Sequence, residues 1–149
     1  MATFPRLNLV EPMEAQAGPA CDQASLERLE MITLDWPPRQ LSPNARVHYS
    51  VKSPITKGYL AHASNTTRVA CHDHGLRDRI DPHSDDPITL AIEFHPPDAR
   101  RRDLDNMLSS IKAGLDGIAE ALGVNDQRFA LRLTRGQPVK GGRVVVTLS

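Results

Sequence analysis

Hydrophobic and polar residues alternate with a period of two at 32–36, 88–94 and 129–133, and a valine-rich stretch follows at 143–148. Successive side chains of a strand point to opposite faces, so this period predicts strands that bury one face. The alternation is cleanest at 88–94, where isoleucine, leucine and phenylalanine are separated by threonine, alanine and glutamate. Together the four stretches predict a small sheet of about four strands.

A hydrophobic stripe with helical spacing lies between the second and third predicted strands. It consists of Leu108, Ile111, Leu115, Ile118 and Leu122. This 3-4-3-4 spacing predicts one amphipathic helix from about Asp105 to Leu122, with Gly123 at its C-terminal cap. Gly114 and Gly117 weaken a helix, so we expect them to permit close packing against another element, and a dimer partner is one candidate.

The region between the first two strands gives weaker signals. Serine, asparagine and two prolines at 41–54 predict a loop, and an alanine-rich stretch at about 56–74 predicts a helix. A polar stretch with two prolines at 81–87 predicts another loop. The expected fold therefore combines helices and strands (α/β, more narrowly α+β). It has a small mixed sheet of about four strands with two helices, in the order β-α-β-α-β-β.

Composition divides the chain into two parts. Residues 1–30 are punctuated by proline and glycine, which predicts a flexible N-terminal extension before a single domain at 31–149. The hydrophobic share of 40% and the charged share of 24% are ordinary for a globular protein. We find no apolar run of membrane-spanning length and no secretory signal pattern, so we expect a cytoplasmic protein. Two cysteines exclude a disulfide framework and a four-cysteine zinc site.

The net charge of zero hides an uneven distribution. Residues 1–30 carry two arginines and five acidic residues, which leaves 16 basic and 13 acidic residues in the remainder. Three consecutive arginines stand at 100–102, and further basic residues crowd the C-terminal quarter. Such clusters favour phosphate binding, but surface basic residues are common, so charge alone does not identify a nucleic-acid-binding protein.

The candidate chemistry lies where the second strand gives way to the long helix. Asp103 and Asp105 are two apart, so in an extended backbone their carboxylates point the same way. Crowded carboxylates repel, and a divalent cation removes that repulsion; Mg²⁺ suits one or two carboxylates with water and phosphate oxygens. The alternative is that one aspartate caps the helix. One cap needs one residue, whereas Asp103, Asp105 and Asn106 stand together behind three arginines.

Asp126 follows the helix, and spacing alone does not place it in the same site. A helix of about 18 residues is about 27 Å long, so the chain must fold back if Asp126 is to meet Asp103. The dipeptide Asn125-Asp126 by itself is a turn signal. The string from Cys71 to His74 resembles a zinc motif, but a second ligand cluster is missing, and we interpret it as an exposed polar loop.

Several motifs together resemble the RusA family of Holliday-junction resolvases, and the resemblance covers residues 31–149. The most specific is the string at 101–106, Arg-Arg-Asp-Leu-Asp-Asn, followed by an amphipathic helix and Asn125-Asp126. The start at 32–38, the Ser-Pro-Asn loop at 42–44 and the Lys-Gly-Gly-Arg turn at 140–143 are similar to the same family.

The resemblance implies that Asp103, Asp105 and Asp126 are catalytic residues that bind Mg²⁺, with Mn²⁺ as an alternative, and that the protein is a homodimer. Better-known members carry a lysine one turn after the second aspartate, where this chain has Ser109. Lys112, three residues later, is the candidate replacement. Asn125 stands where some members have another acidic residue.

The expected function is magnesium-dependent resolution of four-way DNA junctions by paired symmetric nicks, in a bacterial, phage or prophage protein. The residues expected to bind DNA are Arg100, Arg101, Arg102, Lys140 and Arg143. Two alternatives stay open: a nuclease for other branched DNA, and a junction-binding protein that has lost activity with the family lysine.

Overall fold

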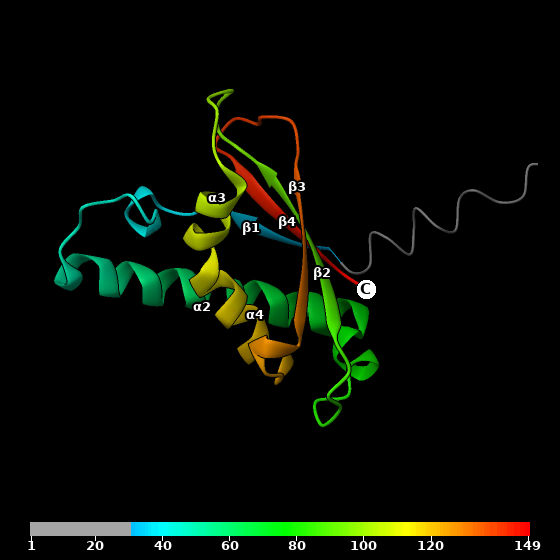
Figure 1. The fold of residues 1–149 in the computed structure, drawn as a ribbon. Coiled ribbons are helices and arrows are strands. Elements are labelled where there is room, and N and C mark those ends of the chain that lie inside the picture. The colour runs from blue at the N-terminus through cyan, green and yellow to red at the C-terminus, as the bar shows by residue number, and fades with distance from the viewer. Residues whose placement is uncertain (1–30) are drawn as a thin grey trace, which may run out of the picture.

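The computed structural model describes residues 31–149, which form one four-stranded mixed sheet and three α-helices (Figure 1). The expected extension at 1–30 lies outside the described residues. The strands are β1 (Met31–Asp35), β2 (Ile88–His95), β3 (Phe129–Arg135) and β4 (Arg143–Leu148), in the spatial order β1-β4-β2-β3. Strand β4 is antiparallel to β1 and β2, whereas β2 and β3 are parallel. The predicted mixed sheet of four strands is confirmed.

The three helices are α2 (Tyr49–His74), α3 (Leu104–Ser110) and α4 (Lys112–Leu122). The core forms where one face of the sheet packs against α2 and α4. Strand β2 alternates between buried and half-buried side chains, as its period of two predicted, and Leu90, Ile92 and Phe94 are fully buried. None of the helices within residues 31–149 combines the length and the apolar character that a membrane span requires.

The predicted single helix at 105–122 is wrong, because it is interrupted at Ile111. The backbone of Ile111 has φ −98° and ψ 4°, and its N–H donates to the carbonyl oxygens of both Met107 and Leu108. The hydroxyls of Ser109 and Ser110 bond back to backbone carbonyls four residues earlier, which competes with regular helix and bends it. Ile111 stays buried, so the predicted stripe survives the break, but the described chain has three helices instead of two.

Helix α2 begins at Tyr49, inside the stretch that was predicted to be a loop. The ring of His48 caps it by accepting a hydrogen bond from the backbone N–H of Ser50 at 3.3 Å. Pro54 lies within the helix and is exposed. A proline this near the start removes only one backbone hydrogen bond, so the capped first turn is retained. The loop predicted at 81–87 is confirmed.

Gly114 and Gly117 pack against α2 of the same chain. A Cβ atom on Gly114 would lie 2.9 Å from Cε1 of Tyr59, and one on Gly117 would overlap the backbone oxygen of Leu60. The expected close packing is confirmed, with an intramolecular partner, so these glycines give no support to a dimer. Tyr59 also donates its hydroxyl to the carbonyl oxygen of Asp35 at 2.9 Å, and burial, then the charge of Asp35, raises the pKa of that hydroxyl.

Candidate active site

The chain leaves β2 at His95, passes through the loop at 96–103 and enters α3. We call this end of the sheet the exit end, and the end at Ile88 the entry end. Asp103 occupies the N-cap position of α3 with an extended backbone (φ −82°, ψ 138°), and its backbone oxygen accepts a hydrogen bond from Met107 N at 3.1 Å. Asp103 therefore occupies the cap position that the alternative interpretation, helix capping, requires.

The carboxylate of Asp103 nevertheless does not perform the capping. It accepts no hydrogen bond from the first turn of α3. Asp105, two residues on, is also exposed, and neither carboxylate forms a hydrogen bond or an ion pair with any residue of 31–149. Two neighbouring carboxylates without protein partners, at the start of a helix, remain available as oxygen ligands.

Arg102 points back into the loop. Its guanidinium donates to both carboxylate oxygens of Asp98, at 2.7 and 3.0 Å, and lies 5.8 Å from the ring centre of Trp36. The hydrogen bond from Arg102, followed by that from the backbone N–H of Arg100, lowers the pKa of Asp98 to about 2. Sequence reasoning did not identify Asp98 and Trp36 as partners of Arg102, because contacts formed across an irregular loop have no periodicity that would reveal them.

The loop at 96–103 is fixed to the sheet at two points. Arg135, the last residue of β3, donates a hydrogen bond to the backbone oxygen of Arg102. Trp36 packs edge-on against buried Phe94, with ring centres 6.5 Å apart. The backbone that precedes Asp103 is therefore held by β2, β3 and the residue that follows β1.

The other predicted DNA-binding residues gather at the same end. Arg143 opens β4 opposite His95, and Lys140 lies in the preceding turn, which is held to the loop by a 2.9 Å hydrogen bond from Val139 N to Pro96 O. Arg100, Arg101, Lys140 and Arg143 are exposed, and within residues 31–149 their side chains form no hydrogen bond or ion pair. The exit end thus unites free cations with the carboxylates of Asp103 and Asp105.

Asp126 lies at the entry end. It begins a short 3-10 turn, η3 (Asp126–Arg128), directly before β3, and the register of the parallel pair places Phe129 beside Ile88 (Figure 1). The eight residues of β2 separate the two ends by roughly 25 Å. In the described part of the chain, no three histidine, cysteine, aspartate or glutamate side chains are grouped so that they could hold a metal ion.

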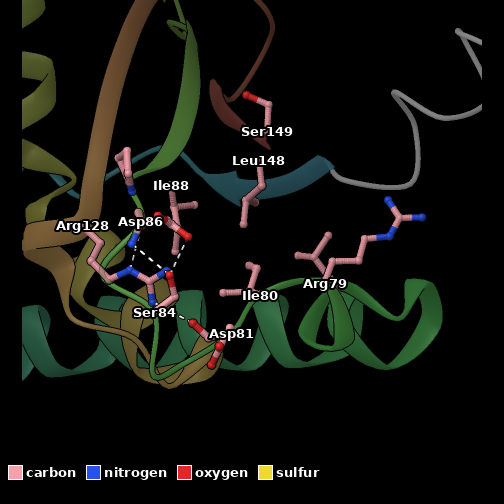
Figure 2. Close-up of a pocket in the computed structure, with 11 residues that line it drawn as sticks. Arg79, Ile80, Asp81, Ser84, Asp86, Ile88, Arg128, Leu148 and Ser149 are labelled. Carbon is pink, nitrogen blue, oxygen red and sulfur yellow. Dashed lines mark hydrogen bonds between the residues drawn. The ribbon is translucent and has the colours of Figure 1, made fainter.

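Hydrogen bonds to neutral acceptors fix the entry end. Arg128 donates from Nε to the backbone oxygen of Asp86 and from Nη1 to that of Asp81, each at 2.9 Å, beside a pocket of about 300 Å³ (Figure 2). The side-chain oxygen of Asn125 caps the turn by accepting from Gln127 N at 2.9 Å. Asp126 is exposed, and its carboxylate has no hydrogen-bond or ion-pair partner in 31–149.

The candidate lysine is less well placed than an unbroken helix would suggest. Lys112 is exposed at the first position of α4, directly after the break at Ile111, so the two-turn spacing from Asp105 no longer fixes its direction. Ser109, at the family's lysine position, bonds to the backbone oxygen of Asp105 at 2.9 Å. The Cys71–His74 string lies in the last turn of α2 instead of in a loop.

Comparison with known proteins identifies several relatives that carry the same name. No protein-family model matches the chain. An uncharacterized protein of Xylella fastidiosa strain Temecula1 is 37% identical over 87% of this chain and 82% of its own length. Proteins named crossover junction endodeoxyribonuclease RusA are 34% identical in Shigella sonnei and 32% identical in Escherichia coli K12, each over 79% of this chain and 92% of the relative. The chain belongs to the RusA family of crossover junction endodeoxyribonucleases.

Proposed function

We propose that this protein is a magnesium-dependent endodeoxyribonuclease that resolves four-way DNA junctions. The observation that carries the proposal is the exit end, where two carboxylates without protein partners stand at the start of α3, beside free cations and a loop that is hydrogen-bonded to the sheet. The names of the relatives, which specify a crossover junction as substrate, support it. Bacterial and phage proteins both occur among these relatives.

The residues fit the expected metal. Mg²⁺ is usually held by one or two carboxylates and keeps several waters, and Asp103 with Asp105 offers such a pair. Mn²⁺ accepts the same oxygen ligands. When bound, the ion would polarise the scissile phosphate and lower the pKa of a bound water. Exposed Arg100, Arg101, Lys140 and Arg143 would contact flanking phosphates, which fixes the position of the strand but carries no sequence information.

The position of Asp126 makes a second copy part of the proposal. The family resemblance assigns three aspartates to one site, yet Asp126 lies a strand length from Asp103 and Asp105 within one chain. A two-fold dimer is self-complementary, so the entry end of each copy can meet the exit end of the other and complete two equivalent sites. Two sites related by two-fold symmetry would place one nick on each of two junction strands.

Lys112 remains a candidate for stabilising charge that develops on the phosphate. It is exposed and forms no hydrogen bond or ion pair within residues 31–149, so its ammonium group is free to approach DNA. Arg102 is less available for DNA than the other predicted DNA-binding residues, because its guanidinium already donates hydrogen bonds to both carboxylate oxygens of Asp98.

The deciding experiment incubates the full chain with an end-labelled synthetic four-way junction, with and without Mg²⁺. Paired nicks that require Mg²⁺, at symmetric positions in opposing strands, are the expected result. Duplex and flap substrates of the same sequence serve as controls, and faster cutting of flaps would reassign the substrate. Tight junction binding without cleavage in either Mg²⁺ or Mn²⁺ would instead identify a binding protein and refute the nuclease.

A further inference from the structure

A groove of about 870 Å³ opens at the exit end, between the segment that follows β1 and the loop at 96–103. Segment 36–47 forms one wall, and residues 97–103 with the inner side of α3 form the other. Asp103 is among the lining residues, so the groove reaches one of the two candidate metal ligands. Its volume lies within the roughly 300–1,000 Å³ range of pockets that enclose small organic ligands.

The groove has an apolar base. Trp36, Pro37 and Met107 line it; Met107 and Pro37 are buried, and Trp36 is half-buried on Phe94. Such a surface suits a flat apolar ligand, because contact removes apolar area from water on both sides. The outside of a DNA duplex offers no such ligand, since the base faces are covered by stacking and only their edges are exposed in the grooves.

The polar lining has the donors and acceptors that a nucleotide needs. The side-chain amides of Gln40, Asn44 and Asn106 form no hydrogen bond within residues 31–149. Four arginines and two aspartates line the groove, and the Arg102–Asp98 pair cancels, which leaves Arg39, Arg100 and Arg101 against Asp103. An amide can donate and accept at once toward a base edge, and arginine suits phosphate.

The wall that carries Gln40 and Asn44 is held in place. Leu41 is buried in the core, and its N–H donates to Pro38 O at 2.9 Å in the short 3-10 turn η1 (Arg39–Leu41). A further turn is closed by the hydrogen bond from Ala45 N to Ser42 O at 3.0 Å. The groove is thus present before any ligand binds, which lowers the entropic cost of binding.

We propose that this groove holds one unstacked nucleotide next to the cleaved phosphate, and that Gln40 and Asn44 read the edge of its base and set the cleavage sequence preference. The inference rests on the proposed nuclease function. At the point of strand exchange a junction already interrupts base stacking, so extruding a nucleotide there costs less than in a continuous duplex. Phosphate contacts alone would leave the cut without sequence preference.

The first test maps cleavage on a junction with a homologous core, in which the branch point samples many sequences. The wild-type chain is expected to cut at preferred sequences, and Gln40→Ala and Asn44→Ala to reduce the ratio of preferred to other cuts by roughly 5- to 100-fold. Asn65→Ala, which removes an exposed amide on α2, is the matched control and should keep the wild-type ratio. Unchanged ratios in both groove variants would overturn the proposal, even if total rates fall.

The second test does not depend on cleavage. Junctions carry 2-aminopurine, a base whose fluorescence rises on unstacking, either at the branch point or ten pairs away, and are bound without divalent metal. A rise at the branch point only, reduced in Gln40→Ala and Asn44→Ala, supports the groove assignment. Bound junction without that rise overturns it. A chain that gives the rise but cuts no junction in Mg²⁺ would refute the nuclease and leave the nucleotide site standing.

Discussion

The two ends of the sheet present the same chemical group in different settings. At the exit end, Asp103 and Asp105 stand at the start of α3 among exposed arginines, after a loop that is fixed by a charged pair between Asp98 and Arg102. At the entry end, Asp126 stands on a short turn fixed by hydrogen bonds to neutral backbone carbonyls. All three carboxylates are exposed and free of protein partners within residues 31–149.

Under the proposed function, one chain holds two incomplete halves of the site. Capping, hydrogen bonding and ion pairing within the described chain use none of the three aspartate side chains, so the fold does not need their charge. The exit end has exposed basic side chains beside its two aspartates, whereas the entry end has one further aspartate at the distance of a whole strand. Residues that stabilise nothing within a protomer and lie far apart are expected when a second protomer completes the site.

The largest effect is expected from the exit-end carboxylates. Asp103→Asn and Asp105→Asn should each lower magnesium-dependent junction cleavage by more than roughly 100-fold, because even the loss of a residue behind a metal ligand costs about 10- to 100-fold. Asparagine is as good an N-cap as aspartate, so the melting temperature should hardly change. Asp85→Asn, at an exposed site on the 81–87 loop, is the control. Cleavage at the wild-type rate in both exit-end variants would exclude a metal role for them.

A mixing experiment tests whether the two halves come from different chains. Asp103→Asn and Asp126→Asn are each expected to be inactive alone. When the two variants are unfolded and refolded together, half of the dimers contain one chain of each variant. If the two chains of a dimer share each site, one of the two sites in such a mixed dimer has all three aspartates. Activity should therefore return to about a quarter of the wild-type level, mostly as single nicks. If all three aspartates came from one chain, the mixture would stay inactive.

The sequence predicted the local elements better than the distances between them. The alternation at 88–94 and the stripe through Ile118 and Leu122 depend on nearest neighbours, and both occur as predicted. The break at Ile111 depends on serine hydroxyls that turn back onto the helix, and the early start of α2 depends on a histidine cap; neither leaves a periodic signal.

In the candidate site, too, local features were predicted better than distances. Asp103, Asp105 and the arginine run were identified from adjacency and resemblance, and the structure brings them to one end of the sheet. The separate position of Asp126 follows from the parallel pairing of β2 with β3, which spacing along the chain does not determine. The distinct role of Arg102 among three adjacent arginines follows from Asp98, a partner in an irregular loop.

A smaller effect is expected from Lys112. A cation at the scissile phosphate contributes electrostatic stabilisation, so Lys112→Ala should slow single-turnover cleavage by about tenfold while junction affinity stays nearly constant. Lys57→Ala, at an exposed position of α2, is the matched control. Ser109→Lys, which restores the family's residue at an exposed site, should recover most of the rate in the Lys112→Ala background. If neither substitution changes the cleavage rate, Lys112 is an exposed surface residue without a role in cleavage.

The smallest expected effect is a difference between the two ends in how their contribution to stability depends on pH. The pKa of Asp98 is lowered to about 2, so the stability that its pair with Arg102 contributes is complete above the ordinary aspartate pKa of 3.8 and is lost as the pH falls through about 2. The bonds from Arg128 to the carbonyls of Asp81 and Asp86 do not titrate. The gap in urea midpoint between wild type and Asp98→Asn should therefore shrink from pH 5 to pH 2.5, whereas the gap between wild type and Arg128→Gln should stay constant. Equal pH dependence of the two gaps would show that the exit end is not held by charge.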